Sequence, residues 1–97
     1  AGQILLNLGR KDEARGAFDA ALALAPAHAG ALNGLGVLAL DANDASAAEA
    51  LFTRAVAADP DYADAHNNLA VALERQGRRD EARTHRAEAQ RLYGERP

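Results

Sequence analysis

The sequence repeats itself with a period of 34 residues, and this period limits the possible fold more than any other feature. The pairs one period apart include Pro26 and Pro60, Ala14 and Ala48, Phe18 and Phe52, and Ala21 and Ala55. Twice the period superimposes residues 9–15 on residues 77–83, without any insertion. Repetition of this length is typical of small units that stack in an array. The 97 residues are too few for a two-domain enzyme with separate cofactor and substrate halves.

Composition indicates that the units are helical. Apolar residues make up 48% of the chain but aromatic residues only 4%, and Met, Trp and Cys are absent. Ala, Leu, Glu and Arg favour helices, while few β-branched or aromatic residues remain to fill a sheet. We therefore expect an all-α fold in which cores of Ala and Leu allow helices to approach closely.

Each period is predicted to form two helices joined by a tight turn. A residue that tolerates a left-handed backbone ends the first helix, and a hydrogen-bond acceptor begins the second helix three residues later. The turn residues are Gly9, Asn43 and Gly77, and the acceptors are Asp12, Ser46 and Asp80, with Ser46 and Glu49 at capping-box spacing. Pro26 and Pro60 then stop the second helix. The predicted helices are 2–8, 12–24, 29–41, 45–58, 63–76 and 80–93.

These residues resemble the tetratricopeptide repeat, a helix-turn-helix unit with a Leu-Gly pair, a small-aromatic-small pattern and a closing Pro. The matching residues are Leu35, Gly36, Ala48, Phe52, Ala55 and Pro60, with Ala14, Phe18, Ala21 and Pro26 one period earlier. The resemblance covers essentially the whole chain and implies a right-handed α-solenoid of about two and a half to three repeats. The expected units are a partial repeat at 1–28, a second repeat at 29–62 and a terminal repeat at 63–97.

The sequence departs from the family pattern at several positions. His66 and Leu32 stand where the family often has Trp, Arg86 stands where an aromatic residue is predicted, and Gly94 replaces a Pro. We expect the last helix to be the polar terminus of the array. Because the chain begins within a first helix, further repeats are expected upstream in a parent protein.

Motifs for catalysis or ligand chemistry have simpler structural explanations. Residues 34–39 fit the dinucleotide pattern G-x-G-x-x-A but lie inside a predicted helix. His28, His66 and His85 lack metal-ligand spacing, and Ser46 is explained as a helix cap. We expect no catalytic residue, metal or cofactor.

Charge is distributed unevenly along the chain. The net charge is −3, which does not favour nucleic acid as a partner. Residues 75–97, however, contain seven arginines and four acidic residues, which form either a docking patch for an acidic partner or a solvated final helix. No apolar run approaches the ~18 residues of a membrane span, so no membrane insertion is expected. A Cys-free chain leaves the compartment open, with a soluble protein of the cytoplasm as the first expectation.

Binding is the remaining function, and stacked helix pairs place their first helices on a concave surface suited to peptides. The resemblance implies that groove residues are Gln3, Leu6, Asn7, Gly30, Asn33, Gly34, Val37, Asp41, Asp64, Asn67, Asn68, Val71 and Arg75. The asparagines would bond a peptide backbone beside the two valines, or simply tolerate half-exposed helix positions.

The resemblance also implies a comparison with family members that bind the C-terminal carboxylate of a partner between Lys and Arg side chains of their first helices. Here Asp64 and Asn68 stand at the positions of those cations, and Gly34 at that of an Asn, so an apolar and partly basic peptide fits better. The predicted function is a non-enzymatic scaffold for a protein or peptide partner. Two alternatives are self-association into a homo-oligomer through exposed repeat ends, and an RNA-binding helical repeat.

Overall fold

The computed structural model describes residues 2–25 and 27–95, with side chains from residue 12 onward. It contains five helices in this range and no strand: α1 (Gly2–Leu24), α2 (Ala29–Asp41), α3 (Ala45–Ala58), α4 (Ala63–Arg75) and α5 (Arg79–Gly94). The last four agree with the sequence prediction to within one residue at each end.

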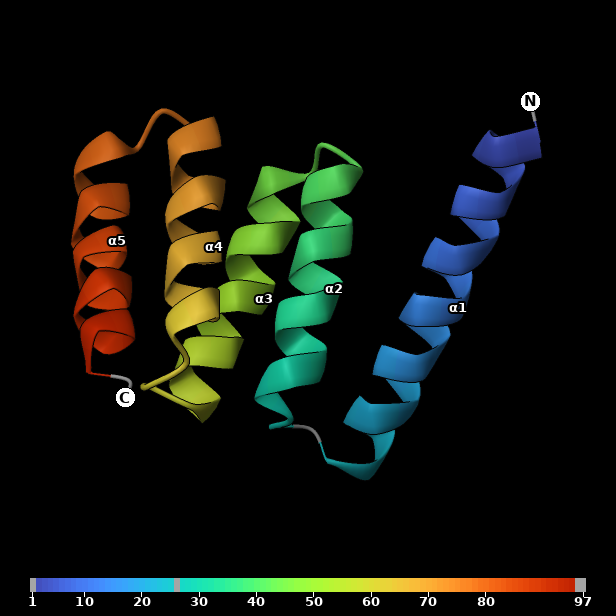
Figure 1. Cartoon of the computed structure of the whole chain (residues 1–97), viewed down its shortest axis with the longest axis horizontal. Helices are drawn as coiled ribbons and strands as arrows, with labels where there is room; N and C mark the ends of the chain where they lie inside the picture. Colours follow the sequence, from blue (N-terminus) through green and yellow to red (C-terminus); the bar gives the residue numbers. More distant parts are fainter. Residues whose placement is uncertain (1, 26, 96–97) are drawn as a thin grey trace.

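The helices stack in chain order as antiparallel neighbours (Figure 1). Helices α2 and α3 pack as one pair, α4 and α5 as the next, and α4 also contacts both α3 and α2. Helices α2 and α4 therefore run in the same direction and lie against one another. The predicted all-α solenoid of helix pairs is confirmed.

Two of the predicted turn residues have the expected left-handed backbone. Asn43 between α2 and α3 has φ 61°, and Gly77 between α4 and α5 has φ 78°. Both reverse the chain within a few residues because this conformation ends a helix and directs the backbone away from its axis. Helices α1 and α3 end at Leu24 and Ala58, two residues before each proline as predicted; Pro26 itself lies outside the described residues.

Close contact between an aromatic ring and a glycine sets the spacing of the core. Phe52 on α3 is fully buried between Ala48 and Ala55, which are also 0% exposed. A Cβ added to Gly36 on α2 would lie 2.4 Å from Cε1 of Phe52, a separation that packed atoms do not reach. The absent side chain at Gly36 therefore gives the ring its space.

The prediction of a helix break at Gly9 is wrong. Helix α1 continues without interruption from Gly2 to Leu24, so Asp12 lies within it rather than at a helix start. A turn at Gly9 would leave about seven residues as a separate helix, which is too short to be stable without extensive packing. Continuing the helix through Gly9 costs about 1 kcal/mol relative to Ala and keeps the backbone hydrogen bonds.

The predicted helix caps at Ser46 and Asp80 are also wrong. The carboxylate of Asp44 caps α3 by accepting a hydrogen bond from the Ala47 amide at 3.0 Å, and Ser46 is already the second helical residue. Because Asn43 completes the turn, the next residue is the one that faces the free amides. Helix α5 follows Arg78, which provides no side-chain cap, and Asp80 lies in its first turn, where it is favoured by the helix dipole.

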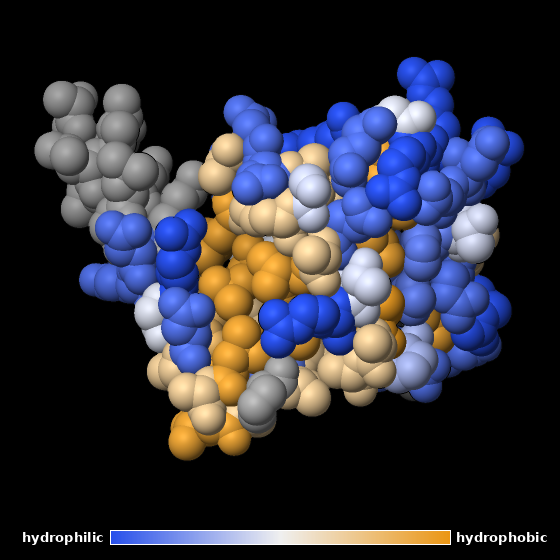
Figure 2. All heavy atoms as spheres, turned by 180° about the vertical axis from the view of Figure 1, so that it is seen from behind, coloured by the Kyte–Doolittle hydropathy of each residue, from blue (hydrophilic) through white to orange (hydrophobic). Residues whose placement is uncertain are grey.

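The two ends of the array differ in surface character. Seen from behind in Figure 2, apolar atoms gather in a hollow beside α1, whereas the end formed by α4 and α5 is mainly hydrophilic. Leu24, at the end of α1, is 90% exposed.

Within the part of the chain that the structure describes, none of the helices combines the length and apolar character needed to span a bilayer.

Replacing Gly36 by Ala is expected to lower the free energy of unfolding by about 1–3 kcal/mol, because the new Cβ would overlap the Phe52 ring. Gly16 on α1 is the matched control, since a Cβ there meets nothing within 4 Å. Gly16→Ala should stabilise the chain by about 0.5–1 kcal/mol through lower backbone entropy in the unfolded state. Urea unfolding followed by circular dichroism measures both; equal effects would contradict a role for the ring contact.

Candidate peptide-binding face

Two rows of side chains, one on α2 and one on α4, form the candidate binding face. Spacings of three and four residues place each row on one side of its helix. The rows are one sequence period apart, and their helices are in contact. This α2–α4 face comprises Gly30, Asn33, Val37 and Asp41 on α2, and Asp64, Asn67, Val71 and Arg75 on α4.

A chain of side-chain hydrogen bonds joins the two helices beside this face. Asn68 Nδ2 donates to Asn33 Oδ1 at 3.0 Å, and Asn33 Nδ2 donates to the Tyr62 hydroxyl at 3.4 Å. All three side chains are half-buried, so these bonds fix the amides of Asn33 and Asn68 in place. The amide of half-buried Asn67 forms no hydrogen bond to another described residue and remains available.

The centre of the α2–α4 face is apolar. Val37 is 38% exposed, and Val71, in the equivalent position on α4, is half-buried against the core around Phe52 and Leu73. An apolar side chain placed between the two valines would lose water contact without displacing the core. This centre therefore offers hydrophobic contact next to the Asn67 amide.

Polar groups stand at the two ends of the α2–α4 face. Arg75 Nη1 donates to the Leu40 carbonyl at 3.0 Å, which satisfies one of the last carbonyls of α2. Asp64, in the first turn of α4, accepts a hydrogen bond from the Tyr93 hydroxyl on α5. Asp41 is exposed as the last residue of α2. Carboxylates thus lie at opposite ends of the face.

Some predicted groove residues lie elsewhere. A Cβ on Gly34 would point at the Phe18 ring, 2.3 Å from its Cζ, so Gly34 faces α1 and not the α2–α4 face. Gly30 does belong to the α2 row, where it lies beside the His28 ring, which caps α2 by accepting from the Ala31 amide at 3.1 Å. The side chains of Gln3, Leu6 and Asn7 lie outside the described residues.

A pair of stacked imidazoles was not foreseen as a pair. His66 on α4 and His85 on α5 have ring centroids 5.8 Å apart and an interplanar angle of 23°. His66 Nε2 lies 2.9 Å from the Pro60 carbonyl, while its buried Nδ1 has no hydrogen-bond partner in the structure. The sequence could have predicted this pair. One period earlier the equivalent residues are Leu32 and Leu51, which indicates that both histidines face the interior.

The environment of this pair affects protonation but provides no metal site. Burial lowers the pKa of His85 below 6.5, and the neighbouring His66 lowers it further, while Glu81 opposes the change. Among the residues whose positions are given, no three metal-binding side chains gather at one point. The pair is best explained as a replacement for two packed leucines.

Comparisons with known proteins identify the family. Two profiles described as tetratricopeptide repeat match residues 1–62 and 39–94, and the chain belongs to this family. It is thus a repeat module of a class that mediates protein interactions. Comparison with curated proteins gives no match.

Solved structures show the same fold. A crystal structure of MamA aligns with a TM-score of 0.79 and 24% identity over 96% of this chain and 54% of that chain. A second crystal structure of MamA protein aligns with a TM-score of 0.75 and 24% identity over 94% of this chain and 50% of that chain. The chain therefore spans about half the length of the solved chains it matches.

Stability should fall as the pH is lowered below about 6.5, because the folded state binds a proton at His85 less readily than the unfolded state does. The stability that neutral His85 contributes is fully present above pH 6.5 and is lost as the pH falls through the lowered pKa of His85. His85→Leu, which restores the residue found one period earlier, should weaken this dependence. Thermal unfolding at several pH values measures it, with exposed Thr84→Leu on the same helix as the control; an unchanged pH dependence in His85→Leu would contradict the assignment.

Proposed function

We propose that the chain is a non-enzymatic scaffold that binds a peptide segment of a partner protein on the α2–α4 face. The observation that supports this most is the amide of Asn67, which forms no hydrogen bond to another described residue and lies beside the apolar centre at Val37 and Val71. An amide can donate to and accept from a peptide backbone, while the valines receive an apolar side chain. The proposal requires no metal, cofactor or nucleic acid.

The carboxylates at the ends of the α2–α4 face favour a particular kind of peptide. Helices α2 and α4 are parallel, so Asp64 at the start of α4 and Asp41 at the end of α2 lie at opposite ends (Figure 1). Asp64 would attract a basic residue near its end of a bound peptide. We therefore propose an apolar segment with at least one flanking Lys or Arg.

Recognition of a C-terminal carboxylate fits this face poorly. Asp64 would repel such a group, and the Asn68 amide is already bonded to Asn33 at 3.0 Å. Arg75 is the one cation of the α2–α4 face, and it is bonded to the Leu40 carbonyl. An internal peptide segment is therefore favoured over a chain end.

The repeats are proposed to divide the chain as a partial unit at 1–28, a second unit at 29–62 and a terminal unit at 63–97. This division assigns α2 and α4 to the same place in successive units. It also explains why equivalent residues from both helices form one surface. A longer array in a parent protein would extend the same surface.

Self-association is a second candidate, and the exposed apolar surface of α1 favours it. Leu24 is 90% exposed, and Phe18 is only half-buried against Gly34. This candidate predicts a mass that rises with concentration in analytical ultracentrifugation and that Leu24→Glu returns to that of one chain. A single-chain mass at every concentration would exclude it.

Binding to the α2–α4 face should be lost in the double variant Asn67→Arg and Val71→Glu. Peptides are first selected on the immobilised wild-type chain from a random display library, and their affinities are then measured by fluorescence anisotropy. We expect affinity to fall by about tenfold or more, since two bulky charges would occupy the central contact. Circular dichroism must show that the variant remains helical.

The matched control places the same new residues on another helix. Thr53→Arg and Ala50→Glu lie on the exposed side of α3 and preserve the net charge of the test variant. Affinity should be unchanged in this control. Equal affinities in the wild type and in the Asn67→Arg, Val71→Glu variant would contradict the proposed face.

A further inference from the structure

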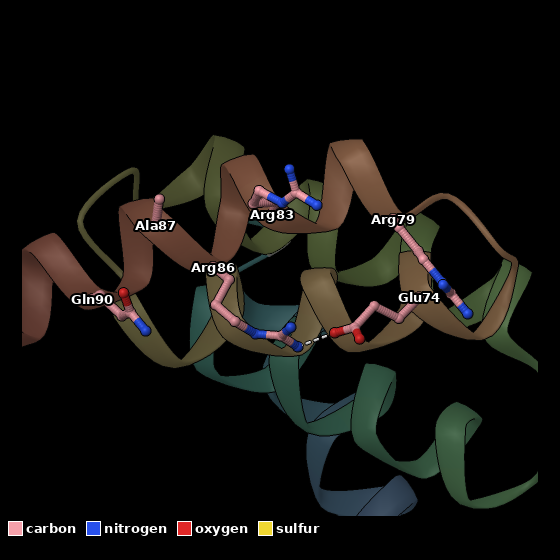
Figure 3. Close-up of a pocket in the computed structure, with 6 residues that line it drawn as sticks. All are labelled: Glu74, Arg79, Arg83, Arg86, Ala87 and Gln90. Atoms are coloured by element: carbon pink, nitrogen blue, oxygen red, sulfur yellow. Dashed lines mark ion pairs between the residues drawn. The ribbon is translucent and has the colours of Figure 1, made fainter.

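A pocket at the last helix pair has arginines at three of its six lining residues (Figure 3). It has a volume of about 360 Å³ and is bordered by Glu74 of α4 and by Arg79, Arg83, Arg86, Ala87 and Gln90 of α5. Three guanidinium groups and one carboxylate thus border the pocket, and the guanidinium group of Arg86 is directed at Glu74. The five α5 residues are called the arginine face below, and they are separate from the α2–α4 face.

Two of the three arginines form no ion pair within the part of the chain that the structure describes. Arg86 forms an ion pair with Glu74, as Figure 3 shows, whereas Arg79 and Arg83 form no ion pair with any described residue. Elsewhere on this end, Arg78 pairs with Glu49 at 2.7 Å, and Arg91 pairs with Glu88 and Glu95. Uncompensated positive charge therefore concentrates at the arginine face rather than along the whole helix.

The sequence period shows what this location does in the preceding helix pair. The equivalent residues are Leu40 for Glu74, Ala45 for Arg79, Glu49 for Arg83, Phe52 for Arg86, Thr53 for Ala87 and Val56 for Gln90. Leu40, Ala45, Phe52 and Val56 pack with residues of α4 in the core. The arginine face thus occupies the place where one helix pair receives the next helix.

An apolar helix cannot dock on the arginine face as α4 does on α3, because the uncompensated guanidinium groups would lose water without gaining partners. An acidic helix can, since its carboxylates would supply those partners. A face needed only for solubility would mix both signs of charge. Here, instead, the two unpaired arginines are one helical turn apart, at i and i+4.

We infer that the arginine face docks an acidic helix of a partner protein, with carboxylates one turn apart paired to Arg79 and Arg83. The hollow beside α4 receives the body of the helix, and Ala87 leaves room for a small side chain at the contact. Arg79 also lies in the first turn of α5, where the helix dipole adds positive potential. The chain would therefore bind two partners, or two segments of one, on separate faces.

The test uses a fluorescein-labelled helical peptide of Ala with Glu at i and i+4 positions as the probe, with binding to the intact chain measured by anisotropy. Arg79→Glu with Arg83→Glu should weaken binding by about tenfold or more, because two attractions become repulsions. The matched control, Arg15→Glu with Arg54→Glu, makes the same charge change at exposed positions on α1 and α3 and should leave the affinity within about twofold of the wild type.

A charge exchange separates specific pairing from a loss of folding. A second peptide with Lys in place of Glu should bind the Arg79→Glu, Arg83→Glu variant but not the wild type. Binding in both cases should weaken as the ionic strength rises from about 0.1 M to about 1 M, over which the Debye length falls from about 10 Å to about 3 Å. A solvated terminal helix would show neither the exchange nor the difference from the control.

Three outcomes would overturn the inference. The first is equal affinity of the Glu peptide for the wild type and for the Arg79→Glu, Arg83→Glu variant. The second is binding of single-stranded RNA of mixed sequence, lost in that variant, without binding of the Glu peptide. The third is a concentration-dependent mass of the chain alone that the variant abolishes, which would make a second copy the occupant.

Discussion

The contact between the Phe52 ring and the backbone of Gly36 determines how closely α2 and α3 approach. Any side chain at position 36 would overlap the ring, which is fully buried together with its neighbours Ala48 and Ala55 on α3. Because this spacing also sets the surface on which α4 packs, it brings α2 and α4 together. The paired rows of the α2–α4 face depend on it.

Most of the fold follows from the sequence because its determinants are local and periodic. Asn43 and Gly77 adopt the left-handed backbone that ends a helix, so the bounds of α2 to α5 could be predicted closely. The break at Gly9 could not, since a glycine turns the chain only where the flanking helices gain enough packing to hold the turn. The cap of α3 could not be predicted either, because it depends on the exact residue at which the helix begins. The helix begins at Ala45, so Asp44 and not Ser46 is the capping residue.

The candidate site could be predicted only in outline. Periodicity places Asn33, Asn67 and the two valines on one side of their helices, but it does not show that Asn68 bonds to Asn33. That bond depends on the distance between two helices, which packing sets. The sequence pattern assigned Gly34 to the groove for a related reason. Which side of α2 a glycine faces becomes clear only from its neighbour in the structure, which for Gly34 is the Phe18 ring of α1.

Equivalent positions in successive repeats have different roles in this chain. Phe52 fills the core between two helix pairs, whereas Arg86, one period later, pairs with Glu74 at the edge of an open pocket. A buried contact between helix pairs is thus replaced by a charged surface at the end of the array.

The central claim is that a peptide binds on the α2–α4 face. The most direct test is an NMR titration of the ¹⁵N-labelled chain with a selected apolar, basic peptide. We expect amide shifts to concentrate at Asn33, Asn67 and Val71; shifts confined to α1, α3 or α5 would contradict binding on the α2–α4 face.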